Sequence, residues 1–141
     1  MAVTNVGPVK QAFVRALRDI TALKAAVGSD GFHEGIALPN PKYPFVVYTV
    51  ASSRRRYTWD PGSILISTFD VFVISGDQVE AHNLDQLILT GMQDKSLTFD
   101  QGSEQSTMLC RRYMDLSFVD VDDAGKKVYQ VGGTYSVWTG Q

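Results

Sequence analysis

Few residues of this chain have the types and spacing that metal binding requires. The two histidines, His33 and His82, and the single cysteine, Cys110, stand far apart in the sequence and match no known ligand spacing. Neither HExxH, CxxC nor a calcium-binding loop occurs. We therefore expect both histidines to be solvated, and we expect no metal site.

The sequence likewise gives little indication of a catalytic nucleophile or of a cofactor-binding loop. The Gly-x-Ser-x-Gly motif is absent, and the glycine-rich positions lack the strand–GxxxxGK–helix context of a phosphate-binding loop. Arg111 and Arg112 follow Cys110 and could lower the pKa of its thiol, but a lone cysteine is more often a small buried hydrophobe. The sequence therefore predicts no catalytic residue and no cofactor, which indicates that the protein is not an enzyme.

Asp70 is the one carboxylate in the largely apolar stretch Ile64–Ile74. An ion pair with a basic side chain, or a contact between subunits, would explain its position. Acid–base catalysis is less favoured because no motif places a second carboxylate beside it.

Three consecutive arginines with nearby aromatic residues are the strongest feature outside the expected core. Arg54, Arg55 and Arg56 precede Tyr57 and Trp59. These residue types contact phosphates, and they are also common at protein interfaces. The alternative is a solvated loop with one aromatic side chain packed on the core. Because the net charge of the chain is −2, protein contact is favoured over nucleic-acid contact.

These residues must be positioned by a core, and Ile64–Met92 is its clearest unit. β-Branched and aromatic residues over 64–74 predict a strand. Gly76 turns the chain, and Asp77 with Glu80 predicts the capped start of a helix. The apolar residues of this helix recur at helical spacing: Ala81, Leu84, Leu87, Ile88 and Met92. The polar residues expected on its surface are His82, Asn83, Asp85 and Gln86.

Similar patterns predict the other elements. Pro8 suits a first helical position and Gly28 a C-terminal cap, so the apolar residues between them predict one helix over 8–27. In the last strand, Gly132 and Gly133 indicate a bulge or the close approach of another backbone. The further strands expected from β propensity and alternation are 45–52, 109–121 and 127–139. The expected loops are 29–44, 54–62 and the long polar segment 93–108, with Leu97 and Phe99 as its apolar anchors.

The predicted order is therefore helix, strand, strand, helix, strand, strand. It favours an α+β fold with two helices packed on one face of a mostly antiparallel sheet of about four strands. The length of 141 residues fits one domain over 1–141, with flexible ends at 1–7 and 139–141. Hydrophobic residues make up 44% and charged residues 20% of the chain, which is typical of a globular protein.

Charge and hydropathy indicate the compartment. A net charge of −2 argues against a generally basic nucleic-acid binder, and a single cysteine forms no internal disulfide. The first residues lack a signal-peptide pattern, and no apolar run approaches the roughly 20 residues that cross a bilayer. We therefore expect a soluble protein that is made in a cytoplasm and has no membrane partner.

The order of these features resembles the tail-completion proteins of long-tailed bacteriophages, also called tail-terminator or head–tail joining proteins. The resemblance rests on PKYPFVVYTV at Pro41–Val50 and on FDVFVIS at Phe69–Ser75, which a helix with a polar start follows. It covers Val9–Met92, with a compatible closing hairpin at 109–139.

The resemblance implies a structural virion protein of the tail or neck, made in the cytoplasm of a host bacterium. Such a subunit forms a hexameric ring on the tail tube, stops its growth and joins it to the head connector. Its partners would be further copies of itself, the tail-tube protein and the head-connector or neck protein, with DNA passing transiently through the ring. Ring contacts join different patches of neighbouring subunits. The candidate contact residues are Arg54, Arg55, Arg56, Tyr57, Trp59, Asp70, Phe72 and Phe99.

Two alternatives stay open. The chain could be a tail-tube or head-completion (connector) protein of the same virion, which would also work by protein contact. A small enzyme is the other alternative, but it would need a concave site with converging polar groups, which the sequence does not indicate.

Overall fold

The computed structural model describes residues 6–35, 42–57, 63–101 and 104–139. These residues form three helices and six strands. In chain order the elements are α1 (Val6–Arg18), α2 (Thr21–Val27), β1 (Phe32–Glu34), β2 (Phe45–Tyr57), β3 (Ser63–Ser75), α3 (Gln78–Met92), β4 (Lys95–Gln101), β5 (Glu104–Val121) and β6 (Lys127–Thr139). Of the ends expected to be flexible, residues 6, 7 and 139 belong to α1 and β6, and the others lie outside the described residues.

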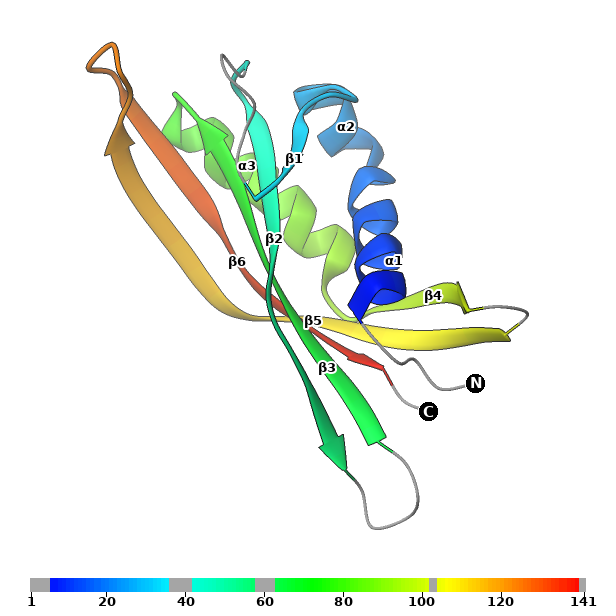
Figure 1. Cartoon of the computed structure of the whole chain (residues 1–141). Coiled ribbons are helices and arrows are strands. Elements are labelled where there is room, and N and C mark those ends of the chain that lie inside the picture. The colour runs from blue at the N-terminus through cyan, green and yellow to red at the C-terminus, as the bar shows by residue number, and fades with distance from the viewer. Residues whose placement is uncertain (1–5, 36–41, 58–62, 102–103, 140–141) are drawn as a thin grey trace.

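All the strands join one curled sheet in the order β1-β2-β3-β6-β5-β4. β1 runs parallel to β2, and every other neighbouring pair is antiparallel. The helices lie on one side of the sheet, and the β2–β3 hairpin projects beyond them at the bottom of the view (Figure 1). Among the described residues, no helix is both long enough and apolar enough to cross a membrane.

The core lies between the sheet and the helices. Alternation along β3 points Phe69, Val71 and Val73 toward the helices, and each is at most 1% exposed. The ring of Phe13 from α1 stacks on that of Phe69 with centroids 4.2 Å apart, and buried Tyr135 of β6 lies beside them. The predicted strand–turn–helix unit is therefore confirmed, as β3 followed by α3.

The predicted fold class, two helices on a mostly antiparallel sheet of about four strands, is wrong. The first difference is that the helix expected over 8–27 is two helices, because the chain leaves helical geometry at Ile20, where ψ is 99°. The side chain of Ile20 packs on α3 at Gly91, where an added Cβ would lie 2.7 Å from Ile20 Cδ1. The break thus lets Ile20 join the core between the helices.

The second difference is that both edges of the sheet carry strands that the sequence patterns miss. β1 has three residues, too few to show alternation, and it pairs Phe32 with Val46 in parallel. The expected loop 93–108 is wrong, because Lys95–Gln101 forms β4 and pairs antiparallel with Glu104–Cys110. An edge strand is held by backbone hydrogen bonds to one neighbour, so a polar sequence can form it.

The expected loop over 54–62 is also partly wrong. β2 continues through Arg54, Arg55, Arg56 and Tyr57, which pair with Ser63–Ile66 of β3. Pairing with a strand of strong β propensity extends the ladder into a stretch that has no alternation of its own. Residues 58–62 lie outside the described residues.

The predicted cap of α3 is confirmed, with one change in its hydrogen bonds. The side chain of Asp77 accepts a hydrogen bond from Val79 N at 2.9 Å. Glu80 does not close a capping box; its Oε1 accepts from Ser75 Oγ at 2.7 Å, and Ser75 Oγ in turn accepts from Asp77 N at 3.1 Å. Ser75, the last residue of β3, therefore joins the strand to the first turn of the helix.

Replacing Asp77 by alanine is expected to lower the free energy of unfolding by about 1 kcal/mol, because the first turn of α3 loses its acceptor. Urea denaturation measures the change. Gln78→Ala is the matched control at an exposed neighbouring position, and it should differ little from the wild-type protein. Equal losses in the two variants would contradict a capping role.

Candidate interaction surface

None of the described helices covers the face of the sheet opposite α1, α2 and α3 (Figure 1), and we call it the open face. The strand register shows which residues share this face, because residues directly opposite one another point to the same side of a sheet. Val47 of β2 lies opposite Phe72 of β3, and Phe72 lies opposite Gly132 of β6. Its large apolar residues are Phe45, Val47, Ile66, Phe72, Ile74, Leu109, Met114, Leu116, Phe118 and Trp138.

Much of the open face is exposed to solvent. Phe118 is 50% exposed, Met114 44% and Trp138 40%. The ring centroids of Phe72 and Phe118 lie 6.0 Å apart, from strands on either side of Gly132, which has no side chain to separate them. Large contiguous apolar patches are uncommon on monomeric proteins and mark contact sites. The open face is therefore the candidate interaction surface.

The double glycine of β6 allows close contacts on both sides of the sheet. A Cβ on Gly132 would overlap the carbonyl oxygen of Val71, and a Cβ on Gly133 would overlap the Arg112 side chain. The predicted close approach of another backbone is confirmed. The bulge lies in the neighbouring strand β5, between Arg112 and Met114.

Asp70 lies half-buried on the open face. Its Oδ1 accepts a hydrogen bond from Thr134 Oγ1 at 2.6 Å, and no basic side chain of the described residues forms an ion pair with it. Phe72 lies two residues along the same face, and both residues line a groove of about 370 Å³. The ion pair considered from the sequence is not seen within the described residues, and the subunit contact stays a prediction.

The other predicted contact residues are the three arginines, Tyr57, Trp59 and Phe99. Arg54 and Arg56 are exposed on the side of the open face, opposite Ile66 and Ile64, whereas Arg55 is half-buried on the other face. The remaining three are Tyr57 in β2, Phe99 in β4 and Trp59; the side chains of the first two, and all of Trp59, lie outside the described residues. The structure thus brings Arg54, Arg56, Asp70 and Phe72 onto one face, and it places Phe99 on the opposite edge strand.

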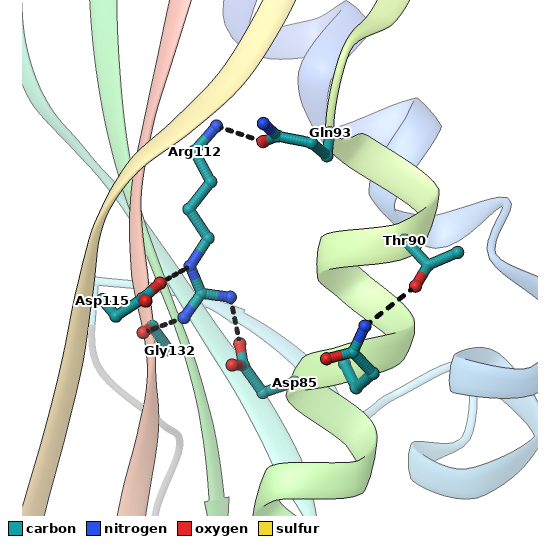
Figure 2. Close-up of polar contacts among 7 residues, drawn as sticks. Asp85, Thr90, Gln93, Arg112, Asp115 and Gly132 are labelled. Atoms are coloured by element: carbon teal, nitrogen blue, oxygen red, sulfur yellow. Dashed lines mark hydrogen bonds and ion pairs between the residues drawn. The ribbon is translucent and has the colours of Figure 1, made fainter.

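A charged cluster around the buried side chain of Arg112 lies between α3 and the helix-covered face of the sheet (Figure 2). The Arg112 side chain is 4% exposed; Nη1 contacts Asp85 Oδ1 at 2.9 Å and Nε contacts Asp115 Oδ1 at 2.7 Å. Nη2 donates to the carbonyl oxygen of Gly132, and the Arg112 backbone N donates to Gln93 Oε1 at 2.7 Å. The cluster ties α3 to β5 and β6.

Burial and neighbouring charges shift the pKa values of the residues in this cluster. Burial raises the pKa of Asp85, and the neighbouring Arg112 offsets only part of that effect. Burial lowers the pKa of Arg112, but the Asp85 carboxylate opposes it and the net change is upward. The Arg112 guanidinium also lies 5.7 Å from the ring centre of Tyr135, whose pKa burial raises. Each charge is held against an opposite charge, which is the arrangement of a structural ion pair.

The sequence patterns miss this cluster, and the expected surface position of Asp85 is wrong. Asp85 is 9% exposed and faces β5. The helical spacing of Asp85 indicates a position on the buried face, because Asp85 lies four residues after Ala81 and three before Ile88, both fully buried. The apolar stripe of α3 therefore contains one carboxylate.

The remaining candidate chemical groups are Cys110 and the two histidines. Cys110 is fully buried, and burial raises the pKa of its thiol to about 12. The prediction of a small buried hydrophobe is confirmed. His82 is exposed as expected, whereas His33 is half-buried with its ring edge-on to Phe45 at 5.5 Å.

Comparisons with known proteins extend the description of the fold. No protein family and no curated protein matches the sequence. A chain from the virion of a native gene transfer agent particle aligns with a TM-score of 0.71 and 12% identity, over 99% of this chain and 100% of its own. A second solved protein aligns with a TM-score of 0.55 and 14% identity, over 99% and 97% of the two chains. At these identities the similarity establishes a shared fold.

Proposed function

We propose that this chain is a structural virion protein that caps a tail tube and joins it to the head connector, as a tail terminator. The observation that carries the proposal is the structural similarity, over nearly the whole of both chains, to a component of a gene transfer agent virion. The resemblance of Pro41–Val50 and Phe69–Ser75 to tail-completion proteins supports the same class of protein.

The open face supports a function that works by protein contact. It exposes Phe118, Trp138 and Met114, and aromatic residues and methionine are enriched at protein interfaces. In the proposed hexameric ring, each subunit contacts its neighbour through two different patches. The tail-tube protein and the neck protein would bind the two rims of the ring, and DNA would pass through its lumen.

A tail-tube or head-completion protein of the same virion is the alternative function. The same fold and the same open face would suit either role, because both assemble through subunit contacts. Assembly separates the alternatives: a tube subunit polymerises without a fixed end, whereas a terminator stops at one ring.

Light scattering after size exclusion, combined with negative-stain electron microscopy, tests the proposal on the purified protein. We expect closed rings of a single size whose mass does not grow with concentration. Extended tubes would favour the tail-tube alternative. A monomer at every concentration, also after purified tail tubes are added, would contradict ring formation.

Replacing Phe118 by serine is expected to weaken self-association at least about tenfold, equivalent to about 1.4 kcal/mol. The fold should be nearly unaffected, because the side chain is already 50% exposed in the single chain. Val79→Ser is the matched control, since Val79 is 67% exposed on α3, away from the open face. Light scattering reports association and thermal unfolding reports stability. If both variants associate alike, the open face is not the contact surface.

A further inference from the structure

The groove of the open face holds a carboxylate that has no basic partner among the described residues. Asp70 lies between Thr49 of β2 and Thr134 of β6, and the groove continues from it along the apolar residues Val47 and Phe72. One of its oxygens accepts from Thr134, which leaves the other available for a further donor. A half-buried carboxylate gains a strong, charge-assisted hydrogen bond from a cationic donor. The groove therefore suits a side chain with an apolar stem and a cationic end.

The end of the β2–β3 hairpin carries side chains of this type. Arg54 and Arg56 are exposed, and register places them on the same face of the sheet as Asp70. Neither forms an ion pair with another described residue. β2, which carries both arginines, projects with β3 beyond the helices (Figure 1), so a neighbouring molecule has access to this part of the hairpin.

The two charges do not meet within one chain. Arg54 lies opposite Ile66, and Asp70 lies opposite Thr49. Four residues of β3 therefore separate their positions, which is about 13 Å along a strand. This separation exceeds the reach of an arginine side chain across a paired sheet, so a contact between these groups requires two molecules.

We propose that the β2–β3 hairpin of one copy places Arg54 or Arg56 in the Asp70 groove of a second copy. The inference rests on the proposed ring and assigns one of its contacts. The hairpin and the groove are different patches, so the contact is heterologous and can repeat around a closed ring. The arginine stem packs on Val47 and Phe72, and the guanidinium donates to the unpaired carboxylate oxygen.

Charge reversal tests the contact. Asp70→Arg and the double variant Arg54→Asp/Arg56→Asp each bring like charges together, and each alone should lose association at least about tenfold. An equimolar mixture should recover association, because each groove then meets a hairpin of opposite charge. Light scattering at low ionic strength measures both results, and added salt should weaken the recovered complex.

Two controls separate this contact from general effects. Arg15→Asp/Lys24→Asp reverses two exposed charges on the helices and should leave association unchanged. Asp70→Asn keeps an acceptor for Thr134 and preserves the shape of the groove, so it should fold normally and still associate more weakly. Circular dichroism confirms folding of every variant.

The outcomes distinguish a failure of the proposed Arg–Asp70 contact from a failure of the proposed ring. If the wild-type protein forms rings and both charge-reversed variants form them equally well, the Arg–Asp70 contact is wrong and the proposed ring stands. If each variant dissociates and their mixture stays dissociated, the pairing is also wrong. A wild-type protein that stays monomeric at every concentration, also after purified tail tubes are added, would overturn both proposals.

Discussion

Replacing Gly132 by alanine is expected to destabilise the protein strongly, because β3 and β6 can no longer pair in their native register. The added Cβ would overlap the carbonyl oxygen of Val71 and lie 2.8 Å from Cα of Phe72. Both atoms belong to the backbone of the paired strand, so no change of rotamer relieves the overlap. We expect a loss of about 3 kcal/mol or more, a large part of the stability of an ordinary domain.

Urea denaturation followed by circular dichroism and tryptophan fluorescence measures this loss. Gly76→Ala is the matched control, because a Cβ there meets no atom within 4 Å. It should change the free energy of unfolding by less than about 1 kcal/mol. If Gly132→Ala and Gly76→Ala have similar free energies of unfolding, β3 and β6 can move apart at Gly132 without loss of stability.

Replacing Arg112 by methionine is expected to lower the free energy of unfolding by about 3 to 5 kcal/mol. The substitution removes the cation that contacts Asp85 and leaves that carboxylate buried without its partner. Arg111→Met is the matched control, because Arg111 is 64% exposed and pairs with the exposed Asp94. Its loss should stay below about 1 kcal/mol. Equal losses would show that the buried pair has no special role.

The double variant Asp85→Leu/Arg112→Met separates the buried charge from the packing. It removes both charges, so it should recover most of the stability that Arg112→Met loses. Chemical denaturation of the single and double variants measures the recovery. A double variant as unstable as Arg112→Met would mean that lost packing, and not the unpaired carboxylate, causes the effect.

The loss in Arg112→Met should also depend on pH. Without the arginine, burial raises the pKa of Asp85 in the folded state above its value in the unfolded chain. The folded state then binds the proton more tightly, so the penalty is full above the folded-state pKa and is relieved as the pH falls through it. Denaturation at about pH 5 should therefore show a smaller loss than at about pH 7.5.

Local patterns predict the elements whose signals are complete within a few residues. Asp77 marks the start of α3, and alternation marks β3 and most of β6. The same patterns fail at Ile20, because the break there depends on a contact with Gly91 that is remote in sequence. They fail at β1 and β4 because edge strands need only a neighbour with open hydrogen-bonding groups.

The candidate surface was only partly predictable for the same reason. Alternation along β3 shows that Asp70 and Phe72 share a face, and it indicates that this face is unusually apolar. It does not show that Phe118 of β5 lies across from Phe72, because that depends on the strand order and on the side-chain-free position at Gly132. The sequence indicates Arg112 only as a neighbour of Cys110, because its buried pairing with Asp85 depends on how α3 packs on β5.

The sequence by itself determined the local properties of this protein: the strand and capped helix of Ile64–Met92, the two glycines of β6, and the lack of recognisable catalytic motifs. These follow from backbone preferences and side-chain periodicity, which act over a few residues. Only the tertiary structure decided the mixed sheet, the burial of Arg112 with Asp85, and the single face that holds Asp70 with Arg54 and Arg56. Each depends on the register between distant strands, which is set by packing across the whole sheet.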